Sequence, residues 1–262
     1  MNTGSMGHAG ALGKQLNQHL KELHLPAIRS YYPTLCELAV KDSMSYESFL
    51  LELLEKECET RQNNRIQRLL RESKLPLEKT MAIFELKRLP LKVTHQVKAL
   101  VEGCFVARHE NVLVFGNPGS GKTHLLCAIG LELVRKGRRV LFATCGLLVQ
   151  DLLLAKKDLS LSKKLKKLSK YDVLIIDDIG YVQHDREEME VLFTLFADRY
   201  ERGSVMLTSN LPFSKWEQIF KDPMVTAAAI DRLVHHSVII ELNLESYRMA
   251  HALQSQKEKV KT

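Results

Sequence analysis

The chain has 262 residues and a formal net charge of +7 at pH 7, with 45% apolar and 26% charged residues. These are ordinary globular values, so collagen-like and disordered classes are excluded, and no apolar run approaches the roughly 18 residues of a membrane-spanning helix. The first ten residues lack the basic and apolar blocks of a signal peptide, and we expect a loose lead-in there. Five scattered cysteines, an odd number, favour reduced thiols and a cytoplasmic protein with no membrane partner.

From residue 12 to about residue 73 the sequence has a helical pattern, with leucines recurring every three or four positions. One helix is expected to begin after Ser45 and to end near Glu72. Its second half carries three arginines within roughly 60° of one another on the helix surface, which are Arg61, Arg65 and Arg68. This stripe is either a nucleic-acid contact or a solvated face that suits the helix dipole.

The pattern changes between Pro76 and Pro90. Five short apolar runs, rich in β-branched residues, are separated by helical lengths and lie at 112–115, 140–143, 173–176, 205–207 and 238–240. Strands that are apolar on both faces are typical of a parallel sheet covered by helices. We therefore predict an all-helical domain over residues 1–78, an α/β domain over residues 79–250 and a basic tail over residues 251–262.

A phosphate-binding loop follows the first of these strands. The segment matches G-x-x-x-x-G-K-[ST] in full and consists of Gly116, Asn117, Pro118, Gly119, Ser120, Gly121, Lys122 and Thr123, with His124 next in the following helix. Glycines let successive backbone N–H groups face phosphate oxygens, and the helix N-terminus adds a favourable dipole. Lys122 is expected to neutralise the β- and γ-phosphates of ATP, and the Thr123 hydroxyl to bind Mg²⁺.

Two carboxylates end the strand at 173–176. In a phosphate-loop enzyme the first, Asp177, holds Mg²⁺, and the second, Asp178, orients an attacking water. Asn210 ends the next apolar strand and is a candidate for hydrogen-bonding the γ-phosphate or positioning water. The alternative is an ordinary exit from a strand into a turn.

Arg232 lies in an otherwise apolar helical segment, where a guanidinium needs an anionic partner. The alternatives are a nucleotide bound by the next subunit and an intramolecular acid such as Asp231. His235 and His236 have no metal-ligand spacing and are expected to be packing or surface residues.

Taken together, GNPGSGKTHL, VLIIDDIGY, LTSNLPF, AIDRLVHH and NLESYR resemble the IstB-type transposition helper ATPases. These are AAA+ proteins encoded by insertion sequences and related to the DnaC helicase loaders and DnaA initiators. The N-terminal segment SYESFLLELLEKECETRQNNRI is similar to that family's helical domain. The resemblance covers most of the chain.

The resemblance implies an AAA+ P-loop fold with a five-stranded parallel sheet, in which the phosphate-loop strand lies beside the strand that ends at Asn210. It implies ATP hydrolysis with Mg²⁺ and self-assembly on duplex DNA without sequence preference. It further implies capture of target DNA and stimulation of a cognate transposase. In these terms Asp178 activates water, Asn210 senses the γ-phosphate, and Arg232 completes a neighbour's site.

Two departures from the family pattern affect these expectations. Asp178 stands where most AAA+ proteins carry Glu, which favours slow hydrolysis stimulated by DNA or a partner. A full helical lid is not expected, and Arg248 either replaces some lid contacts or makes a packing or ion-pair contact.

The densest positive charge lies between the second and third strands. Residues 146–170 hold seven lysines against two aspartates, and the lysines are Lys156, Lys157, Lys163, Lys164, Lys166, Lys167 and Lys170. In the initiator branch an extra helical insertion here faces DNA. Lysines spread around a helix neutralise phosphates without reading bases. The alternative is a solvated helix kept soluble by its lysines.

Three functions fit the sequence. The first is an ATPase that regulates transposition, the second a DnaC-like helicase loader, and the third an ATP-gated scaffold with negligible turnover. The helical domain that resembles IstB favours the first.

Overall fold

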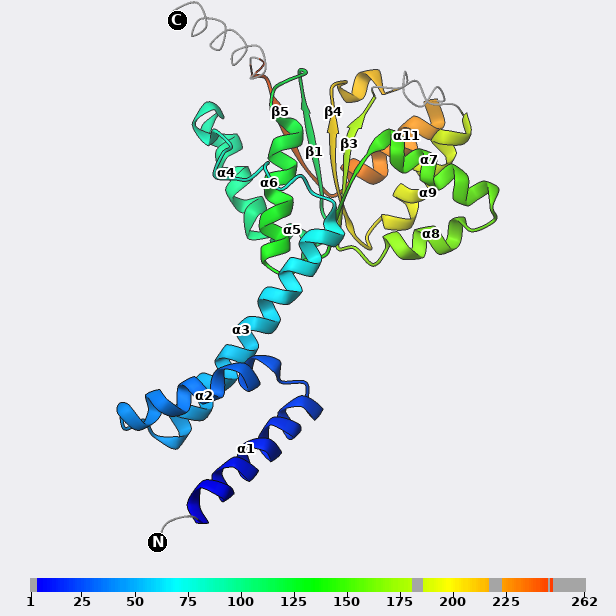
Figure 1. Cartoon of the computed structure of the whole chain (residues 1–262). Coiled ribbons are helices and arrows are strands. Elements are labelled where there is room, and N and C mark those ends of the chain that lie inside the picture. The colour runs from blue at the N-terminus through cyan, green and yellow to red at the C-terminus, as the bar shows by residue number, and fades with distance from the viewer. Residues whose placement is uncertain (1–3, 181–185, 217–222, 245, 247–262) are drawn as a thin grey trace, which may run out of the picture. The chain divides into compact units, whose positions relative to one another are not determined.

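The computed structural model describes residues 4–180, 186–216, 223–244 and 246, shown in Figure 1. The chain divides into two compact units, Met1–Gln67 and Arg68–Thr262. This division lies within helix α3 (Tyr46–Ser73) and therefore before the expected domain boundary at residue 78. Leu69 and Leu75 account for the difference, because both are buried in the core of the second unit.

The first unit is all helical, as predicted, and consists of α1 (Gly4–Glu22), α2 (Pro26–Lys41) and the first part of α3. Because α1 begins at Gly4, the expected loose lead-in is wrong for residues 4–10. The Ser45 hydroxyl accepts a hydrogen bond from the Ser48 amide (3.2 Å) at the start of α3, where the sequence predicts a helix cap. A small core holds the unit together and contains Leu20, Ile28, Leu35 and Leu53.

A buried carboxylate fixes the start of α2 in this unit. Glu57 is 4% exposed, and its Oε2 accepts hydrogen bonds from the amides of Ala27 (2.9 Å) and Ile28 (3.1 Å). Its Oε1 accepts another from Arg61 Nε (2.8 Å). Burial acts to raise the pKa of Glu57, but the hydrogen bonds from Arg61 and the two amides outweigh it, so the pKa is lowered. The carboxylate also complements the positive end of the α2 dipole.

We predict that Glu57→Gln destabilises the first unit by about 1–3 kcal/mol at neutral pH, because a charged acceptor of buried N–H groups is lost. Since the pKa is lower in the folded unit, this contribution is complete at neutral pH. It declines as the pH falls below the ordinary glutamate value of about 4.3 and is gone below the folded-state pKa. Urea unfolding followed by circular dichroism at pH 7 and at low pH measures it. An equal difference between wild type and variant at both pH values would contradict this account.

The second unit is built on a parallel sheet with strand order β2-β3-β4-β1-β5. The strands are β1 (Asn111–Gly116), β2 (Val140–Thr144), β3 (Val173–Ile179), β4 (Ser204–Ser209) and β5 (Ser237–Leu242). Each contains one of the predicted apolar runs. β1 pairs with β4, so the predicted position of the phosphate-loop strand beside the strand that precedes Asn210 is confirmed.

Helices cover both faces of this sheet (Figure 1). One face carries α4 (Leu91–Glu102), α5 (Cys104–Ala107) and α6 (Lys122–Arg135), and the other carries α7 (Cys145–Lys157), α8 (Leu161–Leu168), α9 (Arg186–Arg199) and α11 (Pro223–Val234). Alternate residues of β1 serve the two cores, with Val112 and Val114 in the first and Leu113 and Phe115 in the second. Short 3-10 turns occur at Leu86–Arg88 and Phe213–Lys215.

The lysine-rich segment forms two helices. α7 ends at Lys157 and α8 begins at Leu161, and Leu159 between them has a φ of 52°. The apolar side of α8 packs on the second core and its basic side is exposed, with Leu161, Leu165 and Leu168 opposed to Lys163, Lys166 and Lys167. The expectation that lysines are spread around a helix is therefore wrong for α8, because its leucines occupy the buried side and its lysines are confined to the rest of the helix surface.

A buried arginine joins the end of α8 to the starts of β3 and β4. Arg199, the last residue of α9, is 3% exposed. It donates hydrogen bonds to the carbonyl oxygens of Leu168 (3.2 Å), Tyr171 (3.1 Å), Asp172 (3.2 Å) and Ser204 (2.9 Å). Burial lowers the pKa of Arg199 to about 10, so the guanidinium is still charged at neutral pH. Its charge is balanced by carbonyl dipoles of three chain segments.

Within the described ranges, every helix is too short or too polar to cross a membrane.

Candidate nucleotide site and basic surfaces

β1 brings the chain to the edge of the sheet where the parallel strands end, and the loop of residues 117–121 connects it to α6. Gly116 has a φ of 153°, and a Cβ atom there would lie 2.4 Å from the carbonyl oxygen of Leu242. Gly121 has a φ of 95°, and a Cβ atom there would lie 3.3 Å from the Phe84 ring. Only glycine meets both demands without strain, so the loop keeps its backbone accessible along the site.

Lys122, the first residue of α6, is 7% exposed and folds back over the loop. Its ammonium group donates hydrogen bonds to the carbonyl oxygens of Gly116 (2.7 Å) and Asn117 (3.0 Å) and to Oδ1 of Asn210. The lysine thus joins the loop to the end of β4. Lys122 and Asn210, both predicted from the sequence to contact phosphate, are therefore in direct contact.

Asp177 connects α6 to two strands. Its Oδ1 accepts hydrogen bonds from the hydroxyls of Thr123 (2.8 Å) and Thr208 (2.7 Å). The predicted pair Thr123 and Asp177 is therefore brought together. Thr208, which is 1% exposed, is a site residue that sequence reasoning missed. In the sequence, Thr208 is marked only by its position in Thr-Ser-Asn, the polar end of a predicted strand.

Asp178 occupies an irregularity at the end of β3. The register with β4 shifts between Ile176 and Ile179, and Asp178 has a φ of 68°. Its amide donates to the Thr208 hydroxyl (2.7 Å), and its Oδ1 accepts from Nδ2 of Asn210 (3.2 Å). A bulge changes the direction of a side chain, and here it turns the second carboxylate toward Asn210 and the loop.

A cleft of about 300 Å³ is lined by residues 118–124 together with Asp178, Thr208 and Asn210. Asp177 joins it through its hydrogen bonds with Thr123 and Thr208. One wall comes from residues 79–88, which sequence analysis treated only as the region of the domain junction. His124 Nε2 lies 3.0 Å from the Thr80 carbonyl oxygen, and the Phe84 ring meets the His124 ring edge-on at 5.3 Å between centroids. The predicted residue His124 therefore lies in the cleft wall and positions the segment of Phe84. Only tertiary packing brings this segment to the loop, so no local motif could have found it.

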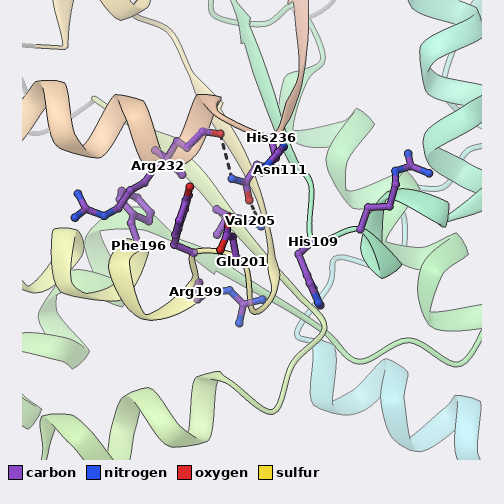
Figure 2. A pocket seen from close by; sticks show the side chains of 11 residues that line it. His109, Asn111, Phe196, Arg199, Glu201, Val205, Arg232 and His236 are labelled. Carbon is purple, nitrogen blue, oxygen red and sulfur yellow. Dashed lines mark hydrogen bonds between the residues drawn. The ribbon is translucent and has the colours of Figure 1, made fainter.

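The structure places Arg232 far from this cleft, in a second cavity of about 250 Å³ at the edge of the sheet where the strands begin (Figure 2). Arg232 Nη1 donates to the Ala228 carbonyl oxygen (3.0 Å), and the guanidinium lies 4.6 Å from the centre of the Phe193 ring. No carboxylate among the described residues pairs with it, so the alternative of an ion pair with Asp231 finds no support.

The three arginines of the predicted stripe are exposed on α3 but differ in their contacts. Arg61 pairs with Glu57 and also donates to the His24 carbonyl oxygen (2.6 Å), so it serves the fold of the first unit. Arg68 lies 4.0 Å from Glu72. Arg65 also has a contact within the chain.

The lysines of α7 and α8 form two groups. Lys156 pairs with Glu190 (2.9 Å) and Lys164 with Asp151 (2.7 Å). The others have no carboxylate partner among the described residues, and these are Lys157, Lys163, Lys166, Lys167 and Lys170. Arg248 and the predicted basic tail at 251–262 lie outside the described residues.

Two arginines that sequence analysis did not single out extend this basic surface. Arg138 and Arg139 precede β2, which pairs with β3. Arg139 lies over the Tyr171 ring at 5.7 Å, and its amide donates to Asp172 (2.7 Å). The start of β2 is therefore next to the turn that follows α8. Adjacency of parallel strands brings the two basic segments together, which a linear charge count cannot detect.

The cleft fits a nucleoside triphosphate with a divalent cation. The loop at the N-terminus of α6 and Lys122 offer donors to phosphate, and the Thr123 hydroxyl and Asp177 carboxylate offer the oxygen ligands that Mg²⁺ prefers. The Ser120 hydroxyl is buried in the loop with no hydrogen-bond partner among the described residues. The strand order and these motifs define an AAA+ nucleotide-binding protein of the P-loop class.

The chain belongs to the family of IstB-like ATP-binding proteins, which it matches over residues 18–255. It is 43% identical to a protein of Sinorhizobium fredii named as an insertion sequence ATP-binding protein, over 92% of this chain and 81% of the relative. It is 38% identical to a protein of Geobacillus stearothermophilus named as an ATP-binding protein of insertion sequence IS5376, over 94% of this chain and 98% of the relative.

A solved structure supports the fold. AMPPCP-bound DnaA from Aquifex aeolicus superimposes with a TM-score of 0.56 over 71% of this chain and 57% of that chain, at 20% identity. At this identity the likeness concerns the AAA+ fold alone.

We predict that Thr208→Val lowers the free energy of unfolding of the second unit by about 1–3 kcal/mol, because Asp177 loses a donor and the Asp178 amide loses its acceptor in a buried place. Thr208→Ser keeps the hydroxyl and should lose less than half as much. Fluorescence of Trp216, the one tryptophan of the chain and fully buried in the second unit, follows urea unfolding. Equal losses in the two variants would show that the hydroxyl is not what matters.

Proposed function

We propose that this protein is a cytoplasmic ATPase that assembles with copies of itself on duplex DNA, captures target DNA and stimulates a partner transposase. The convergence of Lys122, Thr123, Asp177, Asp178 and Asn210 on one cleft carries the ATPase part of the proposal. The insertion-sequence names of its relatives support the role in transposition.

In this proposal each residue of the cleft has a chemical task. Lys122 leaves its contacts with the loop carbonyls to neutralise the β- and γ-phosphates. Thr123 and Asp177 hold Mg²⁺, which, when bound, neutralises the charge that develops on the phosphate oxygens. Asp178 accepts a hydrogen bond from the attacking water, and Asn210, in contact with both Lys122 and Asp178, responds to the presence of the γ-phosphate.

The position of Arg232 supports a site completed between subunits. It lies at the edge of the sheet where strands begin, with Asn111 and Val205 beside it in the same cavity, whereas the cleft lies where strands end. Arg232 therefore cannot reach the nucleotide of its own chain. We infer that it contacts a nucleotide bound to the next copy, where its charge stabilises the transition state.

We predict that Lys122→Ala and Arg232→Ala each lower DNA-stimulated phosphate release by about 10³-fold. A 1:1 mixture should recover roughly a quarter of the wild-type rate, because half of the sites keep Lys122 and half of those meet an intact Arg232 from the other variant.

Phosphate release by each variant and by the mixture, with and without duplex DNA, tests this. An inactive mixture would contradict completion in trans, and unchanged turnover in Lys122→Ala would exclude the ATPase function itself. Negligible turnover of the wild type under all conditions would favour an ATP-gated scaffold.

The α8 surface supports the DNA-binding part of the proposal. Its exposed lysines without carboxylate partners, joined by Arg138 and Arg139, offer positive charges to phosphates. Lys156 and Lys164 are held by acids of the chain and contribute less. On α3, Arg61 is committed to the helical unit, so Arg65 and Arg68 are the better candidates there.

We predict that replacing Lys163, Lys166 and Lys167 by Ala weakens binding to all duplex sequences alike and lowers the slope of log affinity against log salt by about 2–3. The matched control removes three exposed lysines from the opposite layer, outside the cleft wall, which are Lys92, Lys98 and Lys136. Fluorescence anisotropy with labelled duplexes at several salt concentrations measures both. If the control loses as much DNA affinity, the effect comes from net charge alone and not from the α8 surface. Loss of affinity for only some sequences would contradict phosphate contacts.

The helicase-loader alternative has weaker support, because both relatives above have insertion-sequence names and the likeness to a replication initiator concerns the fold alone. Transposition assays with the transposase of the same insertion sequence separate the two functions. A chain that left transposition unchanged but loaded a ring helicase would be a loader.

A further inference from the structure

Three side chains with metal-ligand atoms converge at two turns of the second unit. Glu201 lies in the turn after α9, and His235 and His236 lie in the turn between α11 and β5. One ligand atom of each lies within 4.8 Å of the others, and all three residues are exposed. In the part of the chain that the structure describes, no other group of three histidine, cysteine or acidic residues meets this criterion. The two turns are far apart in the sequence, so a search for metal ligands at short spacings along the chain does not find this group.

Neighbouring residues that enter a strand ordinarily point to opposite faces, but these two histidines do not. Their ring centroids are 4.2 Å apart, with 59° between the ring planes. The His235 amide donates a hydrogen bond to the Asp231 carbonyl oxygen (2.9 Å) at the end of α11. The His236 carbonyl oxygen accepts one from the Asn111 amide (2.7 Å). The backbone on both sides of the pair is thus fixed, and the rings lie on one side of the turn.

Buried Asn111 connects the two segments that carry these turns. Its Nδ2 donates to the Leu233 carbonyl oxygen (3.1 Å) near the end of α11, and its Oδ1 accepts from the Val205 amide (2.8 Å) in β4. Both contacts are drawn as dashed lines in Figure 2, beside Glu201 and His236. Glu201 itself has a φ of 56°, a conformation that costs free energy and persists only where the surrounding structure imposes it. The convergence is therefore built into the fold.

The donor set identifies the class of ion. Two imidazole nitrogens and one carboxylate oxygen suit Zn²⁺ and similar divalent transition metals, whereas Mg²⁺ prefers oxygen ligands alone. His235 Nδ1 lies 3.0 Å from the Tyr200 hydroxyl. If His235 binds through Nε2, that contact orients the ring as outer-shell partners do in known metal sites. With these three ligands, a water would be the fourth ligand of a tetrahedral ion.

We propose that Glu201, His235 and His236 form a binding site for a divalent transition metal of the zinc class. The ion joins the turn after α9 to the turn after α11. Because Arg232 precedes His235 by one helical turn, the metal fixes the segment of α11 that carries Arg232. The site stands apart from the nucleotide cleft, and its existence does not depend on the proposed ATPase function.

Titration of the full chain with Zn²⁺ against a chromophoric chelator tests the proposal. Wild type should bind one equivalent that Glu201→Gln and His236→Gln each weaken by at least about 100-fold. His95→Gln removes an exposed histidine from α4 and should bind as wild type does. Zn²⁺ should also raise the unfolding temperature of wild type and His95→Gln but not of the other two variants.

Co²⁺ in place of Zn²⁺ distinguishes this site from the exposed thiols of Cys36, Cys58 and Cys104. The site contains no sulfur, so bound Co²⁺ should give visible bands without the intense near-ultraviolet band of a cobalt thiolate. Absence of a bound equivalent in wild type, a thiolate band, or equal binding by all variants would overturn the proposal. Circular dichroism and Trp216 fluorescence show whether each variant is folded.

Discussion

The nucleotide cleft depends on one carboxylate oxygen. Oδ1 of Asp177 accepts hydrogen bonds from Thr123 at the start of α6 and from Thr208 at the end of β4, so one atom joins the phosphate loop to two strands. Parallel pairing alone brings strand ends to a common edge, but it does not fix side chains there. Thr208 extends the constraint, because its hydroxyl also accepts from the Asp178 amide. The direction of both acids therefore follows from a short chain of hydrogen bonds.

The motif residues of this cleft could be predicted from the sequence, but the residues that hold them in place could not. The phosphate loop, the two acids and Asn210 occupy characteristic places after apolar runs, so a linear pattern identifies them. Thr208 is indistinguishable in sequence from any polar strand end, since its role arises from the register between β3 and β4. The wall that contains Phe84 belongs to a segment without a motif, and tertiary packing alone brings it to the loop.

The same limit explains the differences in the fold. Periodicity predicted a helix up to about residue 72 but could not assign its last turns to a core, and Leu69 belongs to the second unit. The break between α7 and α8 occurs at Leu159, a residue type that does not signal a positive φ. Sequence spacing places three leucines on one side of α8, but only the packing shows that this side is buried and the lysines are therefore exposed.

The sheet also separates two kinds of chemistry. Its carboxyl edge carries the nucleotide cleft, whereas the edge where strands begin carries Arg232 and the histidine pair. If copies assemble as proposed, with one edge of a copy against the other edge of the next, the contacts are head to tail and generate closed rings or open helical filaments. The rotation between successive copies decides which of the two forms.

Arg199 gives the basic surface a mechanical connection to the sheet. Its guanidinium binds carbonyl groups at the end of α8, at the turn before β3 and at the first residue of β4. A force applied to α8 must therefore break buried, charge-assisted hydrogen bonds or pull on the two strands together. β3 carries Asp178 near its end, and β4 ends at Ser209 beside Asn210. Strain imposed on α8 is therefore carried along the backbone toward these two residues of the cleft.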